Sequence, residues 1–338
     1  MTLTRLELKS FTAFEDLTLD LAPGLNIFLG ANATGKTHLL KVSYAACAVS
    51  KTRGSFADKL VRLFLPSGDS LGRLVHRQRG VSRSSVTVQR NGKRLQAAFH
   101  TKIRLATSAE ESGLEAWAKE PLECVYIPVK EMLANAPGFR ALYGNRDVHF
   151  EEIYADILDR AFRPVLRGQP EATRRKLLQT IREAIDGRVV VEDEEFFLQN
   201  ASGKLEFTLV AEGFRKLALL WLLIQNGTLL DGSVLCWDEP EANLNPRLLG
   251  TVVEILLELQ TLGVQILVAT HDYVFLKELD LRAAAHHSLR YHALHRSSDG
   301  QVRHEAADSL LDIDHNAIAQ TFDDLIQRDI ARSLERRA

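Results

Sequence analysis

Two glycines, a lysine and a threonine lie close together near the start of the chain, in the stretch FLGANATGKTHLL. Their spacing, Gly30-x-x-x-x-Gly35-Lys36-Thr37, is that of a P-loop, whose backbone N–H groups surround phosphate oxygens at a helix N-terminus. In this chemistry Lys36 reaches the β- and γ-phosphates, and Thr37 supplies a hydroxyl to Mg²⁺. A purely structural glycine turn would not explain Lys36 and Thr37. The motif therefore predicts nucleotide binding, with further N–H contacts from Asn32, Thr34 and His38.

Two adjacent acids, Asp238 and Glu239, end the apolar stretch SVLCWDEP. We expect them at the edge where a parallel sheet presents its ligands. Asp238 would hold the Mg²⁺ shell, and Glu239 would orient or deprotonate an attacking water. His271 ends a second apolar stretch, VQILVATHD, and is expected at the same edge, where its imidazole can donate a hydrogen bond to a γ-phosphate. The three side chains predict a hydrolytic site.

The elements that must position these residues follow an α/β pattern. The first thirty residues predict two strands with alternating faces, a Pro23-Gly24 turn and a buried strand that leads into the P-loop. Later strands, at residues 123–128 and in the two apolar stretches above, alternate with amphipathic helices. Such alternation predicts a mostly parallel sheet with crossover helices.

The same patterns divide the chain into regions of one domain, residues 1–338. Residues 1–66 and 204–290 are expected to form the nucleotide-binding core. The dipeptide Asn91-Gly92 favours a two-residue hairpin and predicts an antiparallel β lobe at 67–110. Amphipathic helix interrupted near Pro164 and Gly168 predicts an inserted helical subdomain at 140–190, and residues 291–338 form a C-terminal extension.

Composition bounds the class of protein. The net charge is -2, from 42 basic and 44 acidic side chains, so no overall imbalance points to nucleic acid or a membrane. The cysteines, Cys47, Cys124 and Cys236, lie far apart, which argues against a disulfide framework or a zinc site and favours small core residues. The apolar run LALLWLLI is too short to span a membrane, and the start lacks a signal-peptide pattern. We therefore expect a cytoplasmic protein without a membrane partner.

Local charge and histidine patterns are ambiguous. One segment holds nine basic residues and no acid, at positions 73, 77, 79, 83, 90, 93, 94, 102 and 104. This segment, Arg73 to Arg104, could follow a nucleic-acid backbone, or its side chains could solvate a hairpin or pair with the acids at 192–195.

Six histidines between 286 and 315 favour exposed strand positions over a zinc site. The amphipathic tail, with Leu325 and Ile326 on its apolar side, is expected to pack on its own core rather than on a partner.

The order of four motifs, GANATGKT, AEGFRKLALL, VLCWDEPEANLNP and ATHD, resembles that of the ABC-type ATPase superfamily. There the motifs are the Walker A, the signature, the Walker B with its D-loop, and the switch histidine. The opening LELKSFTAFEDLTLDLAPGLNIFLG is similar to the RecF, SMC and OLD branch, and within it to small ATPases that accompany anti-phage or repair effectors. The resemblance covers the first 50 residues and about residues 204–272.

This resemblance implies a P-loop NTPase of ABC-ATPase type that uses ATP and Mg²⁺. It further implies that two protomers, or a higher homo-oligomer, enclose ATP head to tail and act on a separate effector protein. Gly213 would then face the γ-phosphate bound by the other protomer, and residues 243–246 would form a D-loop at the dimer axis.

The signature departs from the family pattern. Ala211 replaces the usual serine, Glu212 the first glycine, and Phe214 the usual polar residue. A missing hydroxyl removes one phosphate contact, which Arg215 or Lys216 could replace. In the segment YIPVKEML the family's glutamine is absent, and Lys130 or Glu131 are the candidates for its role; a surface turn that caps the next helix is the alternative.

These features favour an ATP-driven switch that controls an effector. A non-hydrolysing scaffold, in which ATP only holds a dimer that sequesters a partner, is the alternative; the altered signature favours it and Glu239 opposes it. A transporter motor, a small-molecule kinase and an intrinsic nuclease find less support, because no membrane segment, arginine-rich lid or carboxylate cluster is present in the sequence.

Overall fold

A six-stranded sheet carries the predicted site. The computed structural model describes residues 2–145 and 148–335. In this sheet five neighbouring strands are parallel and the edge strand β14 is antiparallel. The strands in spatial order are β14 (Val302–Ala307), β13 (Leu289–Arg296), β3 (Leu25–Gly30), β12 (Gln265–Thr270), β11 (Val234–Asp238) and β7 (Cys124–Ile127). Strands β3, β11 and β12 are buried along their whole length, which explains their continuous apolar sequences.

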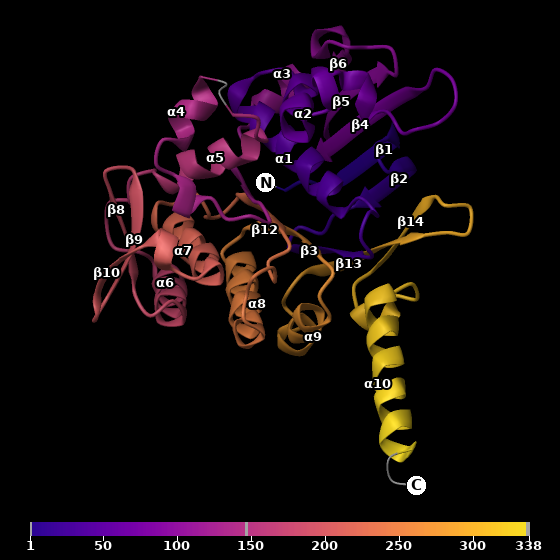
Figure 1. Cartoon of the computed structure of the whole chain (residues 1–338). Helices are drawn as coiled ribbons and strands as arrows, with labels where there is room; N and C mark the ends of the chain where they lie inside the picture. Colours follow the sequence, from indigo (N-terminus) through magenta and orange to yellow (C-terminus); the bar gives the residue numbers. More distant parts are fainter. Residues whose placement is uncertain (1, 146–147, 336–338) are drawn as a thin grey trace.

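Helices cover both faces of this sheet. Helix α1 (Lys36–Thr52) contacts strands β3, β7, β11 and β12 on one face, together with strand β4 of a second sheet. Leu39, Leu40, Val42 and Ala46 are fully buried there. The opposite face packs against α7 (Glu212–Gln225), α8 (Pro246–Thr261) and α9 (Tyr273–Arg282). Figure 1 shows α8 and α9 on the side of the sheet that lies away from the N-terminal strands. The predicted α/β fold with a mostly parallel core sheet is confirmed.

The second sheet is antiparallel and has five strands. It contains the Asn91-Gly92 hairpin, in which both turn residues have positive φ, as a type I′ turn requires. The predicted β lobe is too small, because the first two strands of the chain pair with this hairpin instead of extending the core sheet. In spatial order the strands are β2 (Phe14–Asp20), β1 (Arg5–Phe11), β4 (Arg83–Arg90), β5 (Lys93–His100) and β6 (Glu110–Ser112).

Between β7 and β11 the chain forms a helical region and a small sheet. The two amphipathic helices, α5 (Glu152–Ala161) and α6 (Ala172–Ala184), are separated at the predicted break. The small sheet has the order β10 (Gly203–Glu206), β9 (Glu195–Asn200) and β8 (Arg188–Glu192). Helix α4 (Phe139–Gly144) also lies in this region, whereas α2 (Phe56–Phe64) and α3 (Leu114–Ala118) precede β7. Short 3-10 turns lie at 67–69, 71–74, 106–108, 133–135, 207–209 and 310–312.

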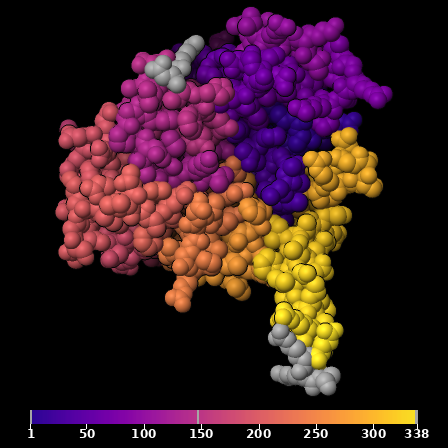
Figure 2. Space-filling view, viewed as in Figure 1, coloured from indigo at the N-terminus to yellow at the C-terminus, as the bar shows by residue number. Residues whose placement is uncertain are grey.

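The last helix, α10 (Ala317–Glu335), projects from the body of the molecule (Figures 1 and 2). Ile318 is buried, and Phe322 stacks on Tyr273 at a centroid distance of 4.2 Å. Leu325 and Ile326, however, are each 51% exposed. The expectation that the whole apolar side packs on the core is therefore wrong for the distal half, because the helix leaves the body after one anchored turn.

The three cysteines are buried and free, as predicted. Within residues 2–145 and 148–335, no helix combines the length and apolar character that crossing a bilayer requires.

Candidate functional site

The register of the core sheet brings the predicted site residues to one edge. Asp238, the last residue of β11, pairs with Ala269 of β12, and Thr270 of β12 pairs with Leu29 of β3. The P-loop, the acidic pair and His271 therefore all begin where neighbouring parallel strands end, which is the edge at which such sheets bind ligands. Residues as distant in the sequence as Leu29 and Thr270 become neighbours only through this pairing.

The two P-loop glycines are required by close approach as well as by backbone conformation. Gly30 has φ 141°, and a Cβ there would lie 2.1 Å from the carbonyl oxygen of Leu294. Gly35 has φ 94°, and a Cβ there would lie 2.5 Å from the ring of Phe14. A side chain at Gly30 would collide with the backbone of β13 and one at Gly35 with the Phe14 ring, so the loop conformation depends on glycine.

Lys36 folds over the loop that it follows. Its Nζ donates to the carbonyl oxygen of Gly30 at 2.7 Å and to that of Ala31 at 3.0 Å. Thr34 Oγ1 donates to the same Ala31 oxygen at 2.9 Å. Burial lowers the pKa of the Lys36 ammonium, while the carboxylates of Glu239 and Asp238 raise it in part. The ammonium is thus held at the sheet edge by weak acceptors that a phosphate can replace.

Asp238 links the P-loop helix to two neighbouring strands. Thr37 Oγ1, in the first turn of α1, donates to Asp238 Oδ1 at 3.2 Å. The hydroxyl of Tyr126, on β7, donates to Asp238 Oδ2 at 3.1 Å. Burial raises the pKa of the Asp238 carboxyl, and the two hydroxyl donors oppose that shift. Sequence reasoning missed Tyr126, because its contact with Asp238 joins two strands that are distant in the sequence.

Glu239 and His271 face each other beside this carboxylate. Glu239 Oε1 lies 3.2 Å from His271 Nδ1, and both side chains are partly exposed. The ring nitrogen of His271 thus lies within reach of the Glu239 carboxylate, and the two side chains can contact the same ligand.

Glu241 is a buried residue that the sequence reasoning did not identify. Its Oε1 accepts from Thr270 Oγ1 at 2.8 Å and from the N–H of His271 at 3.2 Å. Its side chain is 7% exposed, and burial raises its pKa. Glu241 thus fixes the end of β12 against residues 239–244, which we call the acidic turn. The carboxylate two positions after Glu239 was the available signal.

The signature segment begins α7, as the sequence predicts, with Ala211 as the residue before the helix. Gly213 is buried against the acidic turn of its own chain, where a Cβ would lie 2.9 Å from the carbonyl oxygen of Asn243. Arg215 and Lys216 also contact their own chain. Arg215 Nη1 donates to the Phe207 carbonyl at 2.8 Å, and Lys216 Nζ donates to the Ala242 carbonyl at 2.7 Å. Both side chains therefore bind backbone oxygens of their own chain.

Glu131 is buried rather than part of a surface turn. Its side chain has no exposed area, and Oε2 lies 2.7 Å from Arg215 Nε. Its Oε1 accepts from the N–H of Leu133. Lys130, the other candidate, is exposed. The segment after β7 is therefore tied to the start of α7.

Two predicted phosphate-binding positions behave differently from the others. Asn32 is exposed at the tip of the loop. The N–H of His38 already donates to the Gly35 carbonyl at 3.0 Å, and burial lowers the pKa of its imidazole to about 4. The structure therefore brings together Lys36, Thr37, Asp238, Glu239 and His271, whereas His38 faces the protein interior and Gly213 lies on the acidic turn.

Some of the basic residues between Arg73 and Arg104 form contacts within the chain. Arg90 is buried over the ring of Trp117 and donates to the carbonyls of Trp117 and Glu120. Three more members form ion pairs with Glu110, Glu120 and Glu7, rather than with the acids at 192–195: Arg83, Lys93 and Arg94. Within the described chain, five members are exposed and form no ion pair: Arg73, Arg77, Arg79, Lys102 and Arg104. The candidate nucleic-acid surface is correspondingly smaller.

The histidines of the C-terminal extension form pairs. His292 is fully buried, contrary to the expected exposure, and its Nδ1 lies 3.0 Å from His304 Nε2. His295 stacks on His315 at 4.0 Å. Among the residues the structure describes, no three His, Cys, Asp or Glu side chains are grouped in a way that could hold a metal ion.

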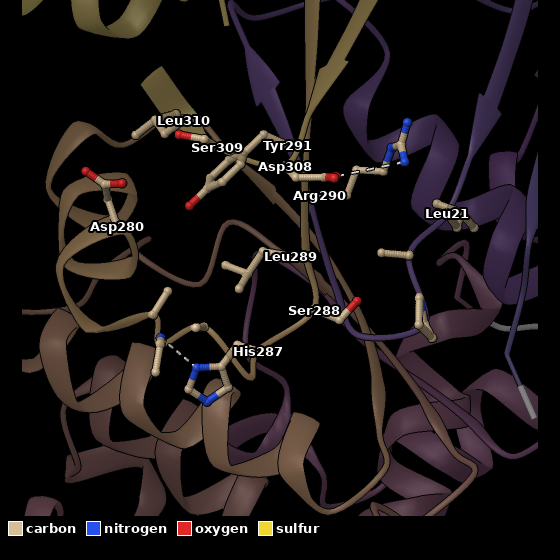
Figure 3. A pocket seen from close by; sticks show the side chains of 15 residues that line it. Leu21, Asp280, His287, Ser288, Leu289, Arg290, Tyr291, Asp308, Ser309 and Leu310 are labelled. Atoms are coloured by element: carbon tan, nitrogen blue, oxygen red, sulfur yellow. Dashed lines mark hydrogen bonds and ion pairs between the residues drawn. The ribbon is translucent and has the colours of Figure 1, made fainter. Parts of the chain in front are cut away.

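An open cavity of about 630 Å³ lies beside the N-terminal ends of β3 and β13, at the edge of the core sheet opposite to the P-loop. Figure 3 shows Tyr291 and Asp280 on one side of it and Ser288 and Arg290 on the other. None of the predicted site residues lines this cavity. It is therefore separate from the candidate nucleotide site.

Comparison with known proteins identifies the family. Residues 25–277 match the model of the family described as "AAA domain, putative AbiEii toxin, Type IV TA system". The chain is 34% identical over 127 residues to the DNA replication and repair protein RecF of Lactococcus lactis subsp. cremoris (strain MG1363), and 29% identical over 125 residues to that of Ligilactobacillus salivarius (strain UCC118). The first match spans 37% of this chain and 34% of that protein, and the second 37% and 33%. The chain thus matches about a third of the length of these relatives.

Two solved structures share the fold. An SmcHead bound to the C-winged helix domain of ScpA has a TM-score of 0.58 at 13% identity, with 91% of this chain and 98% of that chain covered. An Smc head domain with an extended coiled coil, bound to the C-terminal domain of ScpA derived from Pyrococcus furiosus, has a TM-score of 0.53 at 12% identity and covers 90% and 96%. Since the family model spans most of the chain, the protein belongs to this AAA domain family, and it has the fold of the ABC-type ATPases of the RecF and SMC branch.

Proposed function

We propose that this protein is an ATP-binding and ATP-hydrolysing switch that dimerises head to tail and controls a separate effector in anti-phage defence or DNA repair. The observation that carries the proposal is the 3.2 Å hydrogen bond between Thr37 and Asp238, which joins the P-loop helix to the end of β11. Glu239 and His271 lie directly beside this contact. A structural turn would not need this combination at one sheet edge.

The residues at this edge fit Mg²⁺ and a triphosphate. Thr37 and Asp238 present the hard oxygen donors that Mg²⁺ prefers, and would hold the ion between them. When bound, Mg²⁺ would neutralise charge on the phosphate oxygens. Lys36 would exchange its loop carbonyls for the β- and γ-phosphates. Glu239 would hold the attacking water and accept its proton, and His271 would donate to the γ-phosphate.

The partner proteins are inferred from the relatives. RecF is a DNA replication and repair protein, the family description names a Type IV TA system, and both Smc heads are in complexes with ScpA. A protein of this branch that controls an effector is consistent with these names. The exposed distal half of α10 projects from the body of the molecule and would offer an effector a binding surface in addition to the body itself. Gly213 would act in trans, against the nucleotide bound by a second protomer.

The scaffold alternative has its own support. Ala211, Glu212 and Phe214 remove polar contacts from the signature, and Arg215 and Lys216 donate to carbonyl oxygens of their own chain. A scaffold would bind ATP and dimerise without turnover. Glu239 opposes this alternative, because it is positioned beside His271 as a base would be.

ATP turnover and molar mass of the purified protein, measured with ATP and either Mg²⁺ or a chelator, test the proposal. We expect Mg²⁺-dependent phosphate release and a dimer that forms with ATP and dissociates as ATP is consumed, because hydrolysis removes the γ-phosphate that joins the two chains. ATP-dependent dimers without phosphate release would support the scaffold. A molar mass that does not change with nucleotide, together with absent turnover, would contradict both the switch and the scaffold.

The exposed basic residues predict a second, salt-sensitive activity. We propose that Arg73, Arg77 and Arg79 contact a nucleic-acid backbone. Replacing all three with alanine should weaken binding to a DNA duplex and reduce the slope of log K against log salt by about 2 to 3, since each phosphate contact contributes about 0.9. Fluorescence anisotropy over a salt series measures this slope. Arg83→Ala is the control, because Arg83 is already paired with Glu110; an equal loss in that variant would contradict the assignment.

A further inference from the structure

A buried tyrosine hydroxyl holds one oxygen of the carboxylate that ends β11. Tyr126, on β7, is 2% exposed, and its hydroxyl donates to Asp238 Oδ2 at 3.1 Å. Thr37 Oγ1, in the first turn of α1, donates to Asp238 Oδ1 at 3.2 Å. The two oxygens of this carboxylate thus have different partners, one from the neighbouring strand and one from the P-loop helix.

The register of the sheet explains why a tyrosine reaches this carboxylate. Tyr126 pairs with Cys236, and Asp238 follows Cys236 by two positions, so that their side chains lie on the same face of the sheet. Strand β7 ends at Ile127, opposite Trp237 and one residue before Asp238. The long phenol side chain bridges this step, which the shorter hydroxyl side chains of serine and threonine would not span.

The ring of Tyr126 is itself fixed by its surroundings. It packs edge to face on the ring of Tyr44, at a centroid distance of 5.7 Å. Tyr44 is fully buried on α1, and its hydroxyl donates to Asp156 Oδ2 at 2.6 Å. Lys59 pairs with the same carboxylate at 2.8 Å. The Tyr126 hydroxyl is therefore held toward Asp238 by the packing of β7 against α1.

We propose that Tyr126 is a positioning residue for Mg²⁺ binding: by holding Asp238 Oδ2, it keeps Oδ1 beside the Thr37 hydroxyl, where these two residues would hold the ion. Carboxylates that bind metals are themselves usually hydrogen-bonded, and loss of such an outer partner costs about 10- to 100-fold in metal affinity or activity. The inference rests on the proposed function, because it requires Mg²⁺ and nucleotide at this edge of the sheet. It gives Tyr126 no contact with the phosphates.

The first test compares Tyr126→Phe with Tyr44→Phe. Phenylalanine keeps the ring and removes only the hydroxyl. Tyr44→Phe is the matched control, because it also removes a buried hydroxyl that donates to a carboxylate, here that of Asp156. We expect the Mg²⁺ concentration for half-maximal binding of a fluorescent, non-hydrolysable ATP analogue to rise at least about tenfold in Tyr126→Phe and to stay unchanged in Tyr44→Phe. With a chelator in place of Mg²⁺, both variants and the wild type should bind the analogue equally, since Lys36 and the P-loop backbone are untouched.

Binding of Mn²⁺ measures the metal site without turnover. Electron paramagnetic resonance reports the free Mn²⁺ that remains as the ion is added to each protein with the same analogue. Tyr126→Phe should bind Mn²⁺ at least about tenfold more weakly than the wild type and Tyr44→Phe do. Unchanged Mn²⁺ affinity in Tyr126→Phe, or an equal loss in both variants, would overturn the inference.

A double variant tests whether Tyr126 acts through Asp238. Asp238→Ala removes the carboxylate that the phenol would orient. Adding Tyr126→Phe to Asp238→Ala should therefore cause no further loss of Mn²⁺ affinity. A further loss as large as that in the single variant would show that the hydroxyl acts by another route and would contradict the positioning role. Thermal unfolding of each variant, without metal or nucleotide, identifies any loss of the fold.

The same titrations separate this inference from the proposed function. Analogue binding by the wild type that does not depend on Mg²⁺ or Mn²⁺ would contradict the function itself. Metal-dependent binding in the wild type, with the same metal affinity in Tyr126→Phe, would overturn only the role of Tyr126. A metal affinity that falls in Tyr126→Phe alone, with an unfolding temperature close to that of Tyr44→Phe, would support both.

Discussion

Replacing Glu239 with glutamine should reduce ATP turnover by at least about 100-fold while ATP binding stays within a few fold of the wild type. Glutamine keeps the shape of the side chain and cannot accept a proton from water. Glu239 lies 3.2 Å from His271 and one residue from Asp238, and its side chain is 27% exposed to water, whereas that of Glu241 is 7% exposed. Dimers formed with ATP should then accumulate, because the nucleotide that joins them is no longer cleaved.

Phosphate release and light scattering, with ATP and Mg²⁺ at several protein concentrations, measure both effects. Glu254→Gln, on the exposed side of α8, makes the same change of charge far from the site and should behave as the wild type. Unchanged turnover in Glu239→Gln would remove Glu239 from the catalytic role. Loss of turnover without an increase in dimers would support Glu239 as the catalytic base but contradict the proposal that ATP holds the dimer together.

Replacing Lys36 with alanine should weaken ATP binding by at least about 100-fold, which corresponds to about 3 kcal/mol. Lys36 is 7% exposed and its ammonium donates to the loop carbonyls, where a phosphate can take their place through stronger, charge-assisted hydrogen bonds. Because burial lowers the pKa of Lys36, the ammonium loses its proton at lower pH than an exposed lysine does. ATP affinity in the wild type should therefore decline on the alkaline side, and the variant should lack this decline.

Titration with a fluorescent ATP analogue across pH measures the affinity. Lys51→Ala is the matched control, since Lys51 lies at the other end of α1 and pairs with Glu123. Equal affinity in Lys36→Ala and in the control would contradict phosphate binding by this loop. Thermal unfolding without nucleotide shows whether loss of the two loop contacts also destabilises the fold.

The core of the site could be predicted from sequence because its signals are local. The P-loop occupies eight consecutive positions, and its glycines, lysine and threonine are recognised by their spacing alone. Asp238, Glu239 and His271 each end an apolar strand, and parallel strands of one sheet end at one edge. The Asn91-Gly92 hairpin and the break between α5 and α6 were likewise contained within short windows.

Contacts between distant segments could be recognised only in the tertiary structure. Tyr126 reaches Asp238 across 112 positions, and nothing near Tyr126 in the sequence shows that its hydroxyl would be needed there. Arg90 and Lys93 resemble their exposed neighbours, yet Arg90 lies under Trp117 and Lys93 pairs with Glu120. Lys216 suggested a phosphate ligand, whereas the fold directs it into the acidic turn. The spacing of apolar residues over short windows predicts helices and strands. The partner of a charged side chain depends on which distant segments the folded sheet brings together.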